Sequence, residues 1–271
     1  MKLAFSTLGC PDWSWDEIFA TAKDMRIDGI EIRGVGKEMY APHCKIFNRE
    51  NAPATMERMA ASGMEFSALT SGVTLGMPDS REKHEQEVID YIELAARLHI
   101  PYIRVMISPR PEPEEINWEQ AKALYVAWSK LAGEKGVCLL VETNGVLADS
   151  SKMSEFMEGV DPNSTGVLWD VHHPYRFFEE SPYDTYEKIG KYVKYVHVKD
   201  SVMQNEKVAY RMMGYGDVPI FDSLKVLKEG GYDGFITLEW VKRWNQELQE
   251  PGIVFYHYAN YMEYLVQQLE S

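Results

Sequence analysis

Short runs of apolar and β-branched residues alternate with longer amphipathic stretches along the whole chain, and eight such units can be counted in its 271 residues. This βαβα order is typical of a parallel sheet whose strands are covered by helices. A parallel strand is buried on both faces and therefore reads as a nearly continuous apolar run, of which VCLLVETN (137–144) is the clearest example. The pattern restricts the chain to α/β folds built on parallel strands.

We expect strands at residues 3–8, 29–34, 64–70, 102–108, 137–144, 166–170, 192–200 and 234–240. Helices are expected near residues 14–28, 50–62, 79–99, 117–136, 183–191, 220–229 and 253–269. Ser14 and Glu17 have the spacing of a capping box, which places the first helix start. No glycine-rich phosphate motif follows the first strand, so eight units favour a closed (β/α)₈ TIM barrel over an open doubly wound sheet. With no linker-like tract, residues 1–271 are expected to form a single domain.

Charge and cysteine content narrow the range of partners and compartments. Lys and Arg total 28 against 42 Asp and Glu, a formal net charge of -14, which disfavours binding to nucleic acid or to an anionic membrane surface. The three cysteines are widely spaced and form no CxxC pair, which fits a reducing compartment. Neither a signal peptide nor a long apolar run is visible, so we expect a cytoplasmic protein.

Four polar residues follow apolar runs where strands five to eight of the barrel end: Glu142, Asp170, His197 and Glu239. Catalytic groups of such barrels lie at the C-terminal ends of the strands, and these four strands are neighbours. Separate neutralisation of each carboxylate by an Arg, a Lys or a backbone amide stays open. Three converging carboxylates would repel one another, however, and a shared divalent cation removes that cost.

The composition of this group of residues indicates which cations suit it. Three carboxylates and one imidazole, without a thiolate, suit Mn²⁺, Mg²⁺ or Co²⁺ better than a closed structural zinc site, although Zn²⁺ stays open. One divalent cation per chain is the expectation. Such a cation stabilises the enediolate formed when a proton leaves the carbon beside a carbonyl, and Glu142 or Glu239 can then act as the base.

The segments VETN, WDVHHP, YVHVKDS with the following RMMGYGDVP, and GFITLEW together resemble the sugar phosphate isomerase/epimerase family with the xylose isomerase-like TIM barrel. The resemblance implies that Glu142, Asp170, His197 and Glu239 bind one divalent cation. It also implies that the two glutamates serve as acid and base, as in the tagatose and psicose 3-epimerase branch, on a small sugar or polyol substrate of carbohydrate metabolism.

The same resemblance assigns substrate contacts. His173 of WDVHHP matches a residue that contacts a substrate oxygen, and Arg211 matches a substrate-contacting arginine. Many relatives carry a His two residues after the first glutamate, whereas this chain has Asn144, which can still form hydrogen bonds but does not titrate. The identity of the substrate is therefore left open.

Other polar and aromatic residues have weaker functional interpretations. His172 and His173 adjoin, and on an extended segment they would point in opposite directions, so His172 is expected to be structural. Lys199 and Asp200 are expected to support the site rather than to form the second metal site of true xylose isomerases. Aromatic residues of the first two loops could enclose a sugar or simply pack, and three histidines are expected on helices. These residues are Trp13, Trp15, His43 and Phe47 in the loops, and His84, His99 and His257 on the helices.

Three other functions compete with a metal-dependent isomerase or epimerase. An inosose dehydratase-like lyase would use the same cation and base and then expel a β-hydroxyl group. A DNA-repair enzyme resembling endonuclease IV is disfavoured by the net charge of -14 and by only seven histidines. A non-catalytic sugar-binding barrel also stays open, as does assembly into a homo-oligomer.

Overall fold

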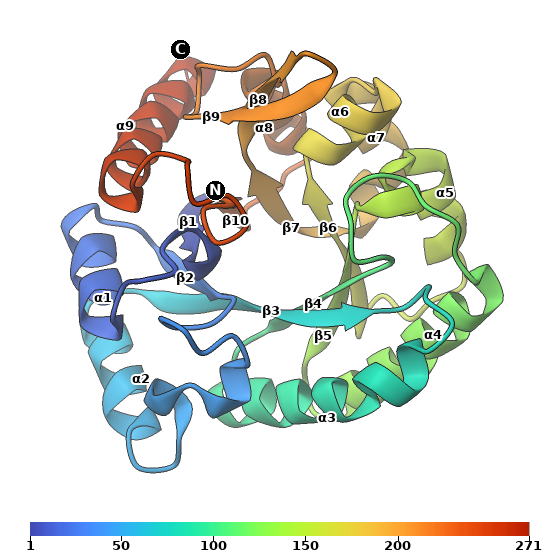
Figure 1. Cartoon of the computed structure of the whole chain (residues 1–271), viewed down its shortest axis with the longest axis horizontal. Helices are drawn as coiled ribbons and strands as arrows, with labels where there is room; N and C mark the ends of the chain where they lie inside the picture. The colour runs from blue at the N-terminus through green and yellow to red at the C-terminus, as the bar shows by residue number, and fades with distance from the viewer. Residues whose placement is uncertain (271) are drawn as a thin grey trace.

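Eight of the apolar runs form parallel strands that close into one barrel (Figure 1). The computed structural model describes residues 1–270. In chain order the barrel strands are β1 (Lys2–Ser6), β2 (Gly29–Ile32), β3 (Glu65–Thr74), β4 (Tyr102–Met106), β5 (Cys138–Glu142), β6 (Thr165–Asp170), β7 (Val193–Val198) and β10 (Phe235–Leu238). Strand β1 pairs in parallel with both β2 and β10, which closes the ring and confirms the predicted TIM barrel.

The helices form a ring outside the strands (Figure 1). They are α1 (Trp15–Asp24), α2 (Ala52–Ala61), α3 (Ser80–Leu98), α4 (Trp118–Glu134), α5 (Ser150–Met157), α6 (His172–Phe178), α7 (Pro182–Ile189), α8 (Ile220–Glu229) and α9 (Pro251–Glu270). Within residues 1–270, none of them is both long enough and apolar enough to cross a membrane. The predicted domain also includes Ser271, which lies outside the described residues.

Local sequence signals explain several of the helix starts. The Ser14 side chain accepts a hydrogen bond from the Glu17 N–H, and the Glu17 carboxylate accepts one from the Ser14 N–H, so the predicted capping box is present. Asn117 caps α4 by accepting from the Gln120 N–H. These caps satisfy N–H groups that have no partner within the helix.

Alternation along each strand divides the apolar residues between two layers. On β5, Leu139 and Val141 pack outward against the helices, whereas Cys138 and Leu140 point into the barrel. The barrel interior is filled by a small cluster: Ala4, Ala68, Cys138, Leu140, Leu168, Tyr195 and Phe235. Because side chains repeat every second residue, the next inward position on each strand lies above this cluster, toward the C-terminal mouth.

The connection between β6 and β7 differs from the expected single helix. It contains two helices, α6 and α7, and α6 begins at His172 directly after β6. The prediction that His172 and His173 lie on an extended segment is therefore wrong, because the chain turns into a helix at the strand end. A further helix, α5, lies between β5 and β6, where the sequence pattern assigned no range.

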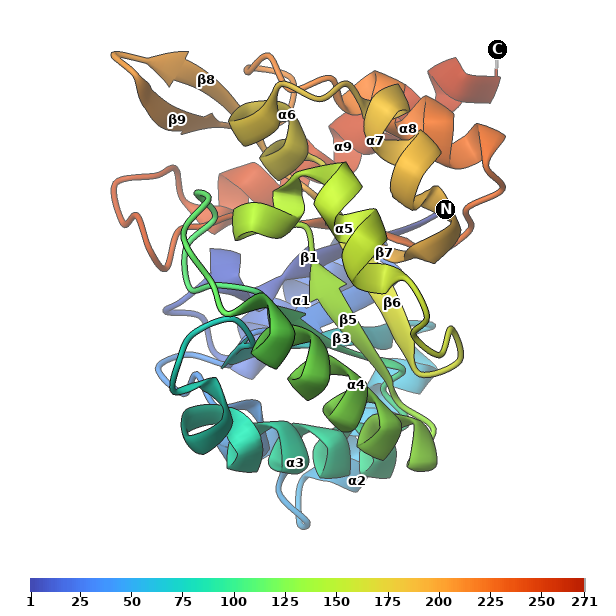
Figure 2. The same ribbon diagram turned by 90° about the vertical axis from the view of Figure 1, so that its right-hand side faces the viewer.

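The seventh strand is shorter than the predicted run of residues 192–200. It ends at Val198, and Asp200 starts an antiparallel hairpin of β8 (Asp200–Gln204) and β9 (Lys207–Arg211), which projects beyond the ring of helices (Figure 2). The Asp200 carboxylate accepts hydrogen bonds from four backbone N–H groups, those of Ser201, Gly214, Gly216 and Val218. These bonds fix both ends of the hairpin, so the role of Asp200 here is structural, as expected.

Candidate active site

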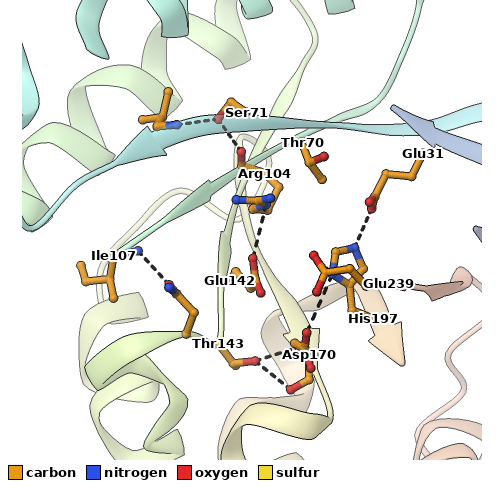
Figure 3. Close-up of polar contacts among 12 residues, drawn as sticks. Glu31, Thr70, Ser71, Arg104, Ile107, Glu142, Thr143, Asp170, His197 and Glu239 are labelled. Atoms are coloured by element: carbon orange, nitrogen blue, oxygen red, sulfur yellow. Dashed lines mark hydrogen bonds and ion pairs between the residues drawn. The ribbon is translucent and has the colours of Figure 1, made fainter. Parts of the chain in front are cut away.

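The four predicted strand-end residues come together at the mouth of the barrel (Figure 3). Glu142, Asp170 and His197 occupy the inward positions of β5, β6 and β7, and Glu239 follows β10 directly. One potential ligand atom from each residue lies within 4.8 Å of all the others, and all four side chains are buried. The glutamates come from the two ends of an arc of adjacent strands, β10-β7-β6-β5, with Asp170 and His197 between them.

A cavity of about 510 Å³ opens above this cluster. Glu142 and Glu239 line it, while Asp170 and His197 are fully buried and are not part of its lining. The other lining residues are Leu8, Arg33, Arg104, Met106, Pro109, Arg110, Pro111, Asn144, His173, Lys199, Tyr210, Val241, Trp244 and Asn245. The volume suits a small-molecule ligand.

The protein supplies its own cations to the carboxylates of the cluster. Arg104 lies with Nε 3.3 Å from Oε2 of Glu142. The Lys199 ammonium contacts the Asp170 carboxylate and lies 2.5 Å from Oε2 of Glu239. Lys199 therefore belongs to the site itself, one inward position beyond His197, and each carboxylate has a cationic neighbour. These two side chains therefore neutralise part of the charge of the converging carboxylates without a metal.

His197 is held by a buried carboxylate that the strand-end pattern did not identify. Its Nε2 lies 2.6 Å from Oε2 of Glu31, on β2, and both side chains are fully buried. The other ring nitrogen, Nδ1, has no hydrogen-bond partner and lies 3.5 Å from Oε1 of Glu239. A carboxylate behind one nitrogen fixes the orientation of the ring and leaves the other nitrogen aimed into the cluster.

The two glutamates lining the cavity have pKa values displaced in opposite directions. Burial is the main cause that raises the pKa of Glu142 to about 7, against the opposing charge of Arg104. Burial acts in the same sense on Glu239, but the Lys199 ammonium and then His197 outweigh it and hold its pKa well below the usual range. Carboxyl groups separated in this way can serve as a proton donor and a proton acceptor at one pH.

The residues present fit a divalent cation. Three carboxylates and an imidazole nitrogen without a partner converge within coordinating reach, and the second nitrogen of that imidazole is bound to a carboxylate, as is usual for histidines that bind metals. Oxygen-rich sets of this kind are typical of Mn²⁺, Mg²⁺ and related ions. Glu142, Asp170, His197 and Glu239 are therefore the residues that would hold it.

The affinity of this cluster for Mn²⁺ is expected to rise with pH between about 6 and 9. The carboxylates of Glu31 and Glu239 outweigh the effect of burial and raise the pKa of His197 to about 9. A cation must displace that proton and the proton of Glu142, whose pKa is about 7. Each displaced proton adds up to about tenfold in affinity per pH unit. Titration calorimetry at pH 6, 7 and 8, in buffers of different ionisation enthalpy, measures the affinity for Mn²⁺ and the number of protons released on binding. An affinity that stays constant or falls as the pH rises contradicts the prediction.

His173 lines the cavity, as the resemblance implied, and its tautomer follows from its surroundings. Its Nδ1 lies 2.9 Å from the Thr143 carbonyl oxygen, which can only accept, so Nδ1 carries the proton. Burial lowers the pKa of His173 to about 4, so the ring is neutral near pH 7. Its Nε2 is therefore available to accept a hydrogen bond from a substrate hydroxyl.

Asn144 also lines the cavity, but its amide is already engaged. It donates to the carbonyl oxygens of Ser108 and Arg110 and accepts from the Ile107 N–H. These bonds hold the loop after β4 against the end of β5. Asn144 thus positions one wall of the cavity.

Arg211 lies outside the cavity lining, on strand β9. Its guanidinium donates to the side chain of Gln204 and to the Tyr210 carbonyl oxygen. The neighbouring Tyr210 lines the cavity instead and stacks on His172, at 5.7 Å between ring centroids. Assigning Arg211 from its position after the seventh strand did not take account of the hairpin, in which successive side chains point to opposite faces.

The remaining candidates pack away from the cavity. His172 is fully buried, with Nε2 2.9 Å from Oγ of Ser201 under the hairpin, in the structural role expected. His84 and His257 contact their neighbours from helices α3 and α9, and His99 is exposed at the end of α3. None of the four early-loop residues lines this cavity: Trp15 and His43 line a separate cavity beside α1 and α2, Phe47 is in the core, and Trp13 packs on Phe255.

Glu31, Arg33 and Arg104 are the site residues that the strand-end pattern missed. They lie in the predicted strands GIEIRG and YIRVMIS. Buried apolar residues flank the charges there, Ile30 and Ile32 beside Glu31 and Ile103 and Val105 beside Arg104. A charge between two apolar residues on a strand covered by helices must point into the barrel. That alternation was visible in the sequence and could have identified all three.

Comparisons with known proteins place this barrel in a family. A family model described as xylose isomerase-like TIM barrel matches residues 19–254. The chain belongs to this family. The xylose isomerase-like barrels that resemble it include a fructoselysine 3-epimerase of Escherichia coli O157:H7, which is 21% identical over 259 residues and is matched over 91% of this chain and 93% of its own length.

Two further relatives of this xylose isomerase-like barrel carry related names. An inosose dehydratase of Clostridium perfringens is 28% identical over 177 residues, covering 56% of this chain and 54% of the relative. The solved structure of a D-psicose 3-epimerase with D-tagatose, from Clostridium cellulolyticum H10, superposes with a TM-score of 0.76 at 18% identity, covering 98% of this chain and 99% of that one. At this identity the structural likeness shows the shared fold.

Proposed function

We propose that this protein is a divalent-metal-dependent epimerase or isomerase that moves a proton on the carbon beside a carbonyl group of a small carbohydrate. The observation that carries the proposal is that two buried glutamates, Glu142 and Glu239, line one cavity from the two ends of a four-strand arc. A substrate carbon held between them can lose a proton to one carboxylate and regain a proton from the other.

Each residue around the cavity has a defined part in this proposal. Glu239 is kept ionised by Lys199 and accepts a proton from the substrate carbon, while Glu142, which lines the other side of the cavity, returns one. His173 accepts from a substrate hydroxyl through Nε2, and Asn144 fixes the cavity wall. Arg211 stays a predicted substrate contact, although its guanidinium here binds Gln204 outside the cavity lining.

The cation completes the electrostatics of the proposed reaction. Glu142, Asp170, His197 and Glu239 would hold a divalent ion, which would supply positive charge to stabilise the negative charge that develops on the substrate oxygen. The protein's part is to present these side chains in a fixed arrangement, which the Glu31 carboxylate secures for His197. The names of the relatives, two 3-epimerases and a dehydratase, support chemistry of this kind.

Deuterium uptake from D₂O tests the proposal directly. The Mn²⁺-loaded protein is incubated with D-tagatose, D-psicose, D-fructose, scyllo-inosose and D-fructuronate, and each sugar is then examined by mass spectrometry and NMR. We expect one deuterium at the reacting carbon of an isomerised product, because the glutamates exchange protons with water. An isomerised product without deuterium indicates a hydride shift and contradicts the proposal, as does the absence of exchange in all five compounds.

A lyase is the second candidate, supported by the likeness to inosose dehydratase over 177 residues. It would share the proton removal and differ in the next step, loss of a β-hydroxyl group as water. The same incubation separates the two functions: a dehydratase gives an unsaturated product 18 Da lighter than the substrate, about the mass of one water, whereas an epimerase gives no loss of mass.

A further inference from the structure

The half of the barrel mouth opposite the predicted metal ligands carries two arginines on or next to its strands, and a third, the exposed Arg110, lines the same cavity from the loop after β4. Arg33 follows β2 and Arg104 lies on β4, and both line the same cavity as Glu142 and Glu239. Figure 3 shows the Arg104 guanidinium on the side of Glu142 away from Asp170. The chain as a whole has a net charge of -14, so two guanidinium groups facing one cavity run against its overall charge.

Arg104 has side-chain donors without a hydrogen-bond partner among residues 1–270. The side chain is only 4% exposed, and its Nε and Nη1 have no hydrogen-bond partner. Its one ion pair, from Nε to Oε2 of Glu142, spans 3.3 Å. Since the proposed reaction uses Glu142 for the cation and for proton transfer, that carboxylate cannot be the sole partner of Arg104. A buried guanidinium in this state is stabilised when a ligand or an ordered water supplies an acceptor.

Arg33 adds a second positive charge at close range. It is partly buried, and its guanidinium donates to the Met39 carbonyl oxygen at 3.2 Å. Burial lowers the pKa of Arg33, and the like charge of Arg104 lowers it further. Each guanidinium therefore makes it less favourable for the other to be charged. Glu87 lies near Arg33 on the side of Gly72, but its carboxylate is engaged by the Gly72 N–H and by His84. Two repelling cations at a cavity wall are stabilised when an anion binds to both.

We propose that the substrate of this cavity carries a carboxylate group, which binds to Arg33 and Arg104 while the reacting carbon lies between Glu142 and Glu239. The inference rests on the proposed function, because it names the substrate class of the same site: a sugar acid rather than a neutral sugar. A planar guanidinium and a carboxylate form charge-assisted hydrogen bonds that are stronger and more directional than those between neutral groups.

The surroundings favour a carboxylate over a phosphate. Phosphate sites of such barrels are built largely from backbone N–H groups in the loops after strands seven and eight. Here the N–H groups of Gly214, Gly216 and Val218, in the loop that follows the seventh barrel strand, already donate to the Asp200 carboxylate. Apart from Lys199, the cations that line the cavity come from β2, β4 and the loop after β4, at the other half of the ring.

Binding of matched acids and neutral sugars tests the inference. Titration calorimetry on the Mn²⁺-loaded full chain compares the affinity for D-glucuronate with that for D-glucose, and the affinity for D-galacturonate with that for D-galactose. D-glucose 6-phosphate is compared with D-glucose and with D-glucuronate. We expect at least one uronate to bind about tenfold or more tightly than its neutral parent, the scale of one charge-assisted contact. If no uronate binds more tightly than its parent, or if the phosphate ester alone shows the preference, the inference is overturned.

Variants connect the preference to the two arginines. Arg33→Gln and Arg104→Gln should reduce the preference for the uronate to less than about twofold, whereas the exposed Arg81→Gln on α3 should leave it unchanged. Arg104→Lys keeps a charge beside Glu142 and serves if the glutamine variant does not fold. A uronate preference that survives in both Arg33→Gln and Arg104→Lys contradicts the assignment.

Failure of this inference can be told apart from failure of the proposed function. If the protein exchanges deuterium into a neutral sugar and does not bind uronates more tightly, the carboxylate inference is wrong and the epimerase proposal stands. Conversely, the protein could bind a uronate preferentially through Arg33 and yet bind no Mn²⁺ and exchange no deuterium. In that case the anion site stands and the metal-dependent chemistry is wrong.

Discussion

Glu239→Gln is expected to lower the rate of deuterium exchange by about two to four orders of magnitude, and Glu142→Gln by a similar factor, because an amide cannot accept or donate the transferred proton. Both side chains line the cavity. The rate is measured on whichever sugar the wild-type protein exchanges fastest. The exposed Glu93→Gln on α3 is the matched control and should exchange at the wild-type rate.

Thermal unfolding of both variants separates loss of chemistry from loss of structure. A glutamine keeps one oxygen that can face the cluster, so the fold should survive in each case. Near wild-type exchange in either folded variant would show that the corresponding glutamate transfers no proton, and the proposed pair of acid and base would be wrong.

His197→Ala is expected to lower Mn²⁺ affinity by more than about 100-fold, since it removes the only nitrogen ligand of the cluster. Asp170→Ala should have an effect of the same order. Glu31→Gln leaves the ligands in place and removes only the carboxylate behind His197, so a loss of about 10- to 100-fold is expected. Calorimetric titration with Mn²⁺ gives all three values.

The exposed His43→Ala serves as the control for these titrations, because His43 lies beside a separate cavity between α1 and α2. The His43→Ala variant should bind Mn²⁺ with the same affinity as the wild-type protein. A His197→Ala variant that binds Mn²⁺ as tightly as the control would mean that His197 is not a ligand of the ion, and the proposed set of four ligands would be wrong.

The site residues at the strand ends were predictable from the sequence because charged side chains are rarely buried without a function or a partner. Glu142 and Asp170 each terminate an apolar run, and a charged residue at such a place is stable only where a polar site surrounds it. The closure of the barrel then brings neighbouring strand ends together. These two facts account for the prediction of the four clustered residues without any structure.

Lateral contacts between strands were harder to predict. Glu31 reaches His197 from β2, across the barrel interior, and that contact depends on the register of eight strands and on a bulge between β2 and β3. Lys199 points inward because it is two residues beyond His197, but the sequence alone does not tell whether the strand direction continues past Val198. Depth within a barrel follows from strand stagger, which single-strand patterns do not contain.

The hairpin explains why Arg211 lies outside the cavity lining. Asp200 accepts four backbone hydrogen bonds and thereby redirects the chain out of the barrel after β7. Residues 207–211 then form a second strand, on which Tyr210 lines the cavity and Arg211 does not. A single aspartate bonded to backbone groups of a later loop leaves no periodic signal in the sequence.

The central claim is that Glu142, Asp170, His197 and Glu239 hold one divalent cation. Anomalous diffraction from a crystal of the protein grown with Mn²⁺ tests it most directly. We expect a single anomalous peak among these four side chains, with Nδ1 of His197 directed at it and Nε2 still bound to Glu31. The absence of a peak there, with the Lys199 ammonium still between Asp170 and Glu239, would contradict the claim.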